Sequence, residues 1–246
     1  LIMTLLIGAI IVVGQLTDVP KLNLLIMTLV SVIVVLFYSN NSAIKNDAGW
    51  GAMKYEQLIY GMIAIFIYVG VEVTIDNNFG ALLKNPGYIT ELGLDESEIS
   101  KYISLYWGSL MIGRWTGAVS VFNLKGNMKK LMMIVVPFIA FAVVLGVSKI
   151  YGNDVSDLYG YAIFIAIAIA TFFYGQEKPV KTLFAVSIFA TAAMLVGVFT
   201  TGITSVYAFM AGGLACSVMW PCIFSLGVGG LGKYTSQGSA FLIMMI

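Results

Sequence analysis

The sequence contains no histidine and little charge. Only 10% of its 246 residues are Asp, Glu, Lys or Arg, whereas an average soluble domain has about 25%. The absence of His removes the commonest metal ligand and acid–base side chain. No catalytic triad, metal-ligand set or nucleotide fingerprint is visible either. We therefore expect no enzymatic activity, no cofactor, no metal site and no nucleic-acid partner.

Cysteine is almost as scarce. Cys216 and Cys222 lie six residues apart in one apolar run. Two cysteines in the same predicted helix do not indicate a disulfide framework.

Apolar residues are correspondingly abundant and make up 60% of the chain. They form repeated runs long enough to cross about 30 Å of hydrocarbon as helices. The sequence therefore predicts an all-α polytopic membrane protein with about eight to nine transmembrane helices. The expected spans are 1–16, 22–38, 58–79, 102–123, 131–149, 159–175, 182–200 and 204–226, with a ninth from 237 onward.

The charges divide between alternate loops. One set of loops holds eight cations and three acids, and comprises 39–57, 124–130, 176–181 and 227–236. The other set holds four cations and seven acids, and comprises 17–21, 80–101, 149–158 and 201–203. Because cytoplasmic loops carry an excess of Lys and Arg, we expect the first set to be cytoplasmic.

The longest cytoplasmic connection divides the chain into three parts. We expect 1–38 to be the end of an N-terminal helical bundle, 39–57 a central cytoplasmic loop and 58–246 a truncated C-terminal bundle. Both ends of the sequence lie inside apolar runs, so we expect it to be a piece of a longer protein.

Glu72 is the most informative residue, because ten almost purely apolar residues precede it. Acids at membrane depth are costly and usually line a cavity or substrate path. A structural carboxyl, hydrogen-bonded to a neighbouring helix, is the alternative. Tyr68 and Asp76 share its helical face, and Asn77 and Asn78 extend this polar stripe towards the outer mouth.

The span around 106–117 offers an aromatic side chain and a cation. Trp107 could stack on a sugar ring, or be a packing residue. Gly113 permits close helix approach. Arg114 is a cation well inside a predicted span, about ten residues before the cytoplasmic loop, and we expect a structural or gating role for it.

Two further segments complete the set of candidates. Trp220 stands before Pro221 inside an apolar run, where a proline interrupts the helical hydrogen bonds and is tolerated beside a cavity. Trp220 is thus either an aromatic platform or a packing residue. Gln237 opens the last span, directly after a glycine-rich turn.

Three ordered motifs resemble one family. They read FIYVGVEV at 66–73, YWG with IGR at 106–114, and SVMWPCIFSL at 217–226. These segments are similar to the seventh, eighth and a later helix of the fucose–proton symporter and glucose/galactose transporter family of the major facilitator superfamily.

The resemblance implies a two-bundle carrier of the inner membrane. It would import a monosaccharide of the fucose, glucose or galactose class by alternating access, coupled to a proton or to sodium. It implies sugar contact by Glu72. From their positions we also expect Asn77 or Asn78 to hydrogen-bond the sugar hydroxyls, and Trp107 and Trp220 to pack on the apolar face of the sugar. The family's main proton-coupling acids lie in the N-terminal half, so proton coupling is not assigned to Glu72.

One feature departs from the family. The compact family has one helix between the Gly-Arg span and the Trp-Pro span, whereas we expect three here, which implies a variant with about fourteen helices. Two alternatives to a sugar carrier stay open: a major facilitator carrier for a different solute, and a membrane sugar sensor that does not transport.

Overall fold

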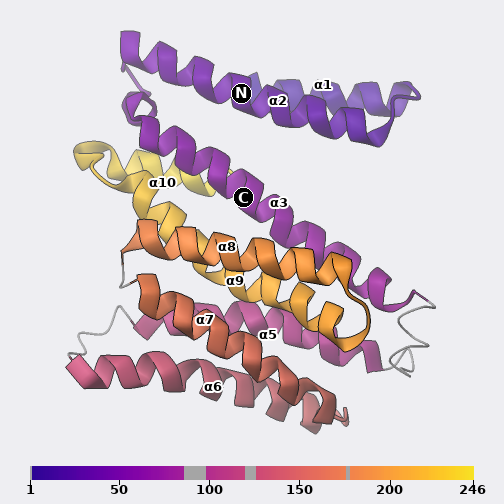
Figure 1. Ribbon diagram of the computed structural model, residues 1–246. Helices are drawn as coiled ribbons and strands as arrows, with labels where there is room; N and C mark the ends of the chain where they lie inside the picture. Colours follow the sequence, from indigo (N-terminus) through magenta and orange to yellow (C-terminus); the bar gives the residue numbers. More distant parts are fainter. Residues whose placement is uncertain (1, 86–97, 120–125, 176–177) are drawn as a thin grey trace. The chain divides into compact units, whose positions relative to one another are not determined.

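The computed structural model describes residues 2–85, 98–119, 126–175 and 178–246, and throughout these ranges the regular structure is helical (Figure 1). The α-helices are α1 (Ile2–Leu16), α2 (Lys21–Lys45), α3 (Glu56–Leu83), α5 (Ile99–Ala118), α6 (Gly126–Ile150), α7 (Ala162–Gly175), α8 (Pro179–Phe199), α9 (Gly202–Val228) and α10 (Thr235–Ile243). Short 3₁₀ helices are η1 (Gly51–Lys54), η4 (Ser156–Tyr161) and η5 (Gly232–Tyr234). Parts of the predicted loops 80–101, 124–130 and 176–181 fall outside the described residues.

Within the described ranges, six helices are long and apolar enough to cross a membrane: α2, α3, α6, η4 with α7, α8 and α9. The chain is therefore a multi-pass helical membrane protein. The predicted count of eight to nine spans is not confirmed. α1 has 15 residues and α10 has nine, and α5 carries Lys101 and Arg114 within its 20 residues.

The chain divides into two compact units. The terminal unit comprises Leu1–Phe66 and Phe224–Ile246, and the central unit comprises Ile67–Ile223. Helices α3 and α9 each contribute to both units. The predicted division at 39–57 into two bundles stays a prediction.

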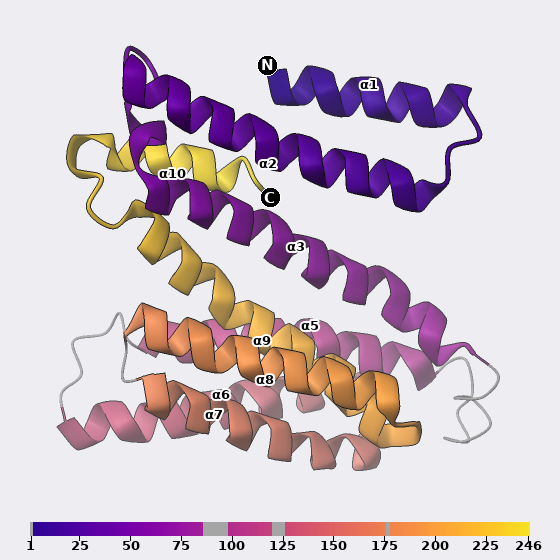
Figure 2. The ribbon, with the colours of Figure 1, turned by 45° about the horizontal axis from the view of Figure 1, so that its top comes forward.

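In the terminal unit, α1 and α2 form an antiparallel pair (Figure 2). A side chain at Gly14 would meet Leu24 at 2.6 Å, so glycine lets the two helices approach. Pro20 immediately precedes α2, which suits a residue that lacks a backbone donor.

The predicted loop 39–57 is partly helical. Helix α2 continues to Lys45, and η1 follows after one short turn. The helix extends further than expected because Asn40, a residue that often ends helices, donates its side-chain amide to the Met53 carbonyl oxygen at 2.7 Å and is thereby satisfied.

The first turns of α3 and the last turns of α9 pack closely in the terminal unit. A β-carbon placed on Gly61 would lie 3.1 Å from the α-carbon of Gly227. Small residues allow such close crossings between apolar helices. Helix α10 packs beside η1.

In the central unit, α5 lies beside α6 and α7 lies beside α8 (Figures 1 and 2). Three helices of membrane-spanning length, α6, η4 with α7, and α8, separate α5 from α9 along the chain. This agrees with the three helical segments expected there.

Alternate connections of the central unit meet at opposite ends of its helices. The end of α5 and the start of α6 lie beside the end of α7 and the start of α8, and the links α6–η4 and α8–α9 lie at the other end (Figure 1). This is the alternation on which the charge-based orientation depends.

Candidate functional site

Glu72 lies partly buried in the middle of α3, with 17% of its side chain exposed. Its Oε1 is 3.9 Å from Nη2 of Arg114 on α5. Its Oε2 is buried and has no hydrogen-bond partner among the described residues. A buried acceptor without a partner costs about 1–3 kcal/mol. The carboxylate therefore has unused hydrogen-bonding capacity.

Two tyrosines hold the backbone and surroundings of Glu72. Tyr106 of α5 donates its hydroxyl to the backbone carbonyl oxygen of Glu72 at 2.9 Å. Tyr68, one helical turn before Glu72, is buried and interacts electrostatically with the carboxylate. In the sequence, Tyr106 stands out only as part of the YWG motif, and no contact was predicted for it. Its hydrogen bond to α3 fixes the backbone position of Glu72.

Glycines bring α5 and α9 together next to this point. A β-carbon on Gly113 would lie only 1.6 Å from Oγ of Ser217, and one on Gly213 would lie 2.9 Å from the ring of Tyr106. The absence of a side chain at Gly113 thus permits this close approach. Arg114 follows it directly, with 59% of its side chain exposed.

The remaining residues of the polar stripe are more accessible. Asp76 lies one turn after Glu72 and is half-buried, whereas Asn77 and Asn78 are exposed. Asn78 donates its amide to the Thr74 carbonyl oxygen at 2.8 Å, which leaves its amide oxygen as the group for a ligand.

Pro221 does not interrupt α9, which runs without a break from Gly202 to Val228. Pro221 itself is exposed, and Trp220 beside it is half-buried. The helix accommodates the proline, as membrane helices commonly do.

Trp107 lies apart from Glu72. It lines a cavity of about 1040 Å³ between α5 and α6, together with Ser104, Val144 and Ser148. Trp107 follows Tyr106, and successive residues of a helix point about 100° apart. Tyr106 contacts α3 and Trp107 faces α6 for this reason.

Gln237 belongs to the terminal unit. Its Oε1 accepts a hydrogen bond from the Ala52 backbone amide at 2.8 Å, and its Nε2 donates to the Gly49 carbonyl oxygen at 2.9 Å. Gln237 therefore holds the turn before η1.

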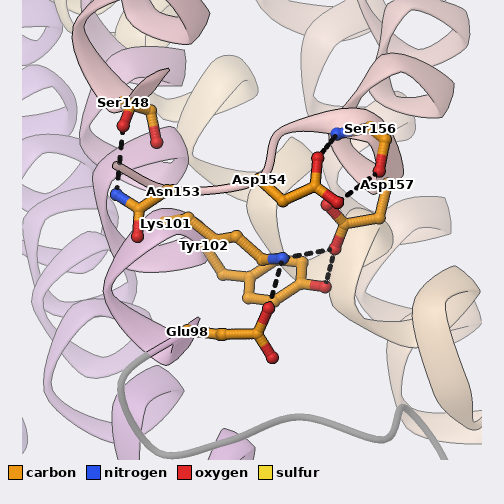
Figure 3. A network of polar contacts seen from close by, with 8 residues as sticks. All are labelled: Glu98, Lys101, Tyr102, Ser148, Asn153, Asp154, Ser156 and Asp157. Atoms are coloured by element: carbon orange, nitrogen blue, oxygen red, sulfur yellow. Dashed lines mark hydrogen bonds and ion pairs between the residues drawn. The ribbon is translucent and has the colours of Figure 1, made fainter. Parts of the chain in front are cut away.

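An ion pair made by a buried lysine was not anticipated from the sequence. Lys101, at the start of α5, is 3% exposed, and its Nζ lies 3.1 Å from Oδ2 of Asp157 and 3.5 Å from Oε1 of Glu98 (Figure 3). The Tyr102 hydroxyl also donates to Asp157 Oδ2. The sequence offers one signal, a lysine directly before an apolar run, but none that identifies Asp157.

Asp154 stands beside this network and shapes the turn into η4. Its carboxylate accepts hydrogen bonds from the backbone amide and the hydroxyl of Ser156, at 3.0 and 2.9 Å. These bonds, with the backbone amide first, hold the pKa of Asp154 below its usual range. The acid is therefore ionised near neutral pH.

Comparison with known proteins identifies two informative relatives. The chain is 28% identical, over 204 residues, to a Brucella abortus protein named glucose/galactose transporter, a match that covers 83% of this chain and 36% of that protein. It is 34% identical over 83 residues to the Escherichia coli L-fucose-proton symporter, covering 34% of this chain and 19% of that protein. No family model matches the chain, and no solved structure matches it.

These relatives support the resemblance that the three motifs predicted. The match to the Brucella abortus protein extends well beyond the motifs, over most of the chain. The chain nevertheless spans only about a third of that relative's length.

Proposed function

We propose that this chain, a relative of the fucose–proton symporters and glucose/galactose transporters, is the substrate-binding part of a secondary active transporter that imports a monosaccharide of the fucose, glucose or galactose class. The chain would contribute eight to nine spans of a major-facilitator-type bundle in the inner membrane. Transport would proceed by alternating access, and the protein would be a carrier and not an enzyme.

The carboxylate of Glu72 carries this proposal. Its Oε2 is buried without a partner among the residues that the structure describes, in a helix that is otherwise strongly apolar. A sugar presents several hydroxyl donors, and a buried acceptor discriminates strongly in favour of a ligand that satisfies it. Carboxylates also accept charge-assisted hydrogen bonds, which are stronger than neutral ones.

The other contacts follow from their positions. Asn77 and Asn78 would offer amide groups to further hydroxyls from one to two turns along α3. Trp220 would pack against the apolar face of the sugar ring, since aromatic side chains provide a flat apolar surface.

A second group of residues would support the conformational cycle. Arg114 would help to latch the cytoplasmic side, and Gly113 would let α5 approach α9 closely. Tyr68 and Asp76 would shape the polar stripe, Pro221 would allow α9 to bend, and Gln237 would anchor the turn before η1.

Coupling to a proton is part of the proposal, with sodium as the other candidate ion. The Escherichia coli relative is named as a proton symporter. We do not assign the coupling role to Glu72, because its partner Arg114 and its unsatisfied oxygen favour ligand binding.

Uptake of labelled fucose, glucose and galactose into vesicles, with and without a proton gradient, tests this function. We expect Glu72→Ala to abolish uptake while membrane expression is retained. Glu56→Ala, at the exposed start of the same helix, is the matched control and should transport normally. Normal uptake by Glu72→Ala would remove Glu72 from the site.

The same assay separates the competing functions. A sugar sensor would bind monosaccharide without accumulating it in vesicles. A carrier for another solute would neither bind nor accumulate the three sugars.

A further inference from the structure

The cavity between α5 and α6 lies entirely within the central unit. Its volume of about 1040 Å³ is at the upper end of the roughly 300–1,000 Å³ typical of small-molecule sites. Along α5 it is lined by Ser104, Trp107 and Met111. Ser100 precedes these residues on the same face of the helix. Along this face, two hydroxyl side chains are followed by an aromatic and then by an apolar side chain.

A residue with an unsatisfied hydroxyl, Ser148, lines this cavity. Ser148 of α6 lines the cavity and is only 4% exposed, and its Oγ has no hydrogen-bond partner among the described residues. Its carbonyl oxygen is occupied by the amide of Asn153 at 3.2 Å (Figure 3). Because buried polar groups in native proteins are normally paired, the free hydroxyl indicates a missing ligand group.

Trp107 supplies a flat apolar surface for that ligand. It is 53% exposed although it lines the cavity, and its ring is fixed by an edge contact with Tyr106 at a centroid distance of 6.2 Å. An aromatic ring held beside hydroxyl groups matches a pyranose, which has an apolar face and polar edges.

The charges at the rim exclude anionic ligands. Glu98 and Asp154 both line the cavity. Lys101, which pairs with the lining residue Glu98, is buried and also paired with Asp157 (Figure 3). Carboxylates at the entrance repel anions and accept hydrogen bonds from a neutral polyol.

From these features we infer that the α5–α6 cavity is a second monosaccharide subsite, with Trp107 as its aromatic platform and the Ser148 hydroxyl as a sugar contact. The inference rests on the proposed function, and it separates Trp107 from the site at Glu72. The charge distribution predicts that the cavity opens on the outer side, where it would receive sugar before transport.

Equilibrium binding of labelled glucose, galactose and fucose to the full-length protein in nanodiscs tests the subsite, provided that no glycoside detergent is present. We expect Glu72→Gln to retain one saturable sugar site. In this background Trp107→Ala should weaken the remaining binding by roughly tenfold or more. Trp115→Ala is the matched control, because Trp115 is an exposed tryptophan of the same helix that does not line the cavity, and it should bind normally.

A second variant keeps the test decisive if Trp107→Ala fails to fold. Ser104→Phe places a ring into the cavity from an exposed position and should also abolish the remaining binding. Complete loss of binding in Glu72→Gln alone would overturn the second subsite while leaving the proposed transport function intact. Equal affinity in the Trp107→Ala and Trp115→Ala variants would overturn it too. Absence of sugar uptake by the unmodified protein would instead contradict the proposed function.

Discussion

The guanidinium of Arg114 lies 3.9 Å from the carboxylate of Glu72, across the contact between α5 and α3. Arg114 is largely exposed, and Glu72 is largely buried. Such a long pair with one exposed partner contributes less than about 1 kcal/mol to stability. The contact is therefore better suited to orienting the carboxylate than to holding the helices together.

Replacing Arg114 should affect transport more than folding. In Arg114→Gln the carboxylate keeps its packing but loses its oriented cation, so we expect sugar uptake to fall roughly tenfold. The thermal midpoint should shift by no more than about 3 °C. Vesicle uptake and thermal unfolding measure the two effects. A large loss of stability with unchanged uptake per folded molecule would contradict the orienting role.

The close contact of α5 and α9 predicts a different outcome at Gly113. Its substitution by Ala would drive a methyl group into Ser217, and overpacking of this kind costs about 1–3 kcal/mol. Ser217→Ala should recover part of that loss in the double variant. The free energy of unfolding in detergent measures both.

Gly117, one turn further along α5, provides the control. A β-carbon there would have no neighbour within 4 Å. Gly117→Ala should leave stability unchanged or raise it slightly, because Ala is the better helix former. Equal destabilisation at both glycines would mean that α5 and α9 do not pack at Gly113.

Much of the helical arrangement follows from the sequence, because the apolar runs are long and most of them are bounded by charged residues. All nine predicted segments contain a helix within the described residues. The end of α2 was misplaced because Asn40 bonds to Met53, 13 residues later. No local pattern reveals a partner at that separation.

The candidate site was less predictable, because its contacts also join residues that are far apart in the sequence. Glu72 could be found from the sequence, because it is a carboxylate inside an apolar run. Its neighbours depend on helix rotation, so adjacent Tyr106 and Trp107 diverge to different surroundings. The pair Lys101–Asp157 joins residues 56 positions apart, and only the packing of α5 against η4 brings them together.

The ion pair of the buried Lys101 at the start of α5 should be sensitive to removal of one partner. Asp157→Asn leaves Lys101 buried, with the more distant Glu98 carboxylate as its remaining ion-pair partner among the described residues. We expect the free energy of unfolding to fall by about 2–4 kcal/mol. This is less than the largest losses for buried pairs, because Asp157 is partly exposed. The double variant with Lys101→Met should recover much of it. Lys149→Met, an exposed lysine near the same end of the unit, should have little effect in the same unfolding measurement.

Acidification should loosen the turn before η1. The Lys54 ammonium at 3.1 Å, and then the Tyr234 hydroxyl, hold the pKa of Asp47 below its usual 3.8. A carboxyl with a lowered folded-state pKa stabilises the fold above its ordinary pKa, and this contribution disappears as pH falls through the folded value. Amide exchange over residues 48–55, corrected for intrinsic rates, should accelerate below about pH 4. Asp47→Asn should remove this step, and Asp154→Asn should not.

Gln237 should stabilise the same turn by a contribution that does not depend on pH. Gln237→Ala removes two hydrogen bonds, one from the Ala52 backbone amide and one to the Gly49 carbonyl oxygen. The Ala52 amide is then left without that partner. A net contribution of about 0.5–1.5 kcal/mol per bond predicts a loss of about 1–3 kcal/mol. Ser236→Ala, at the exposed neighbouring position, should change nothing. Because the bonds are neutral, the loss should be the same at pH 7 and at pH 4. A loss that appeared only at neutral pH would mean that Asp47 holds this turn and that Gln237 merely lies against it.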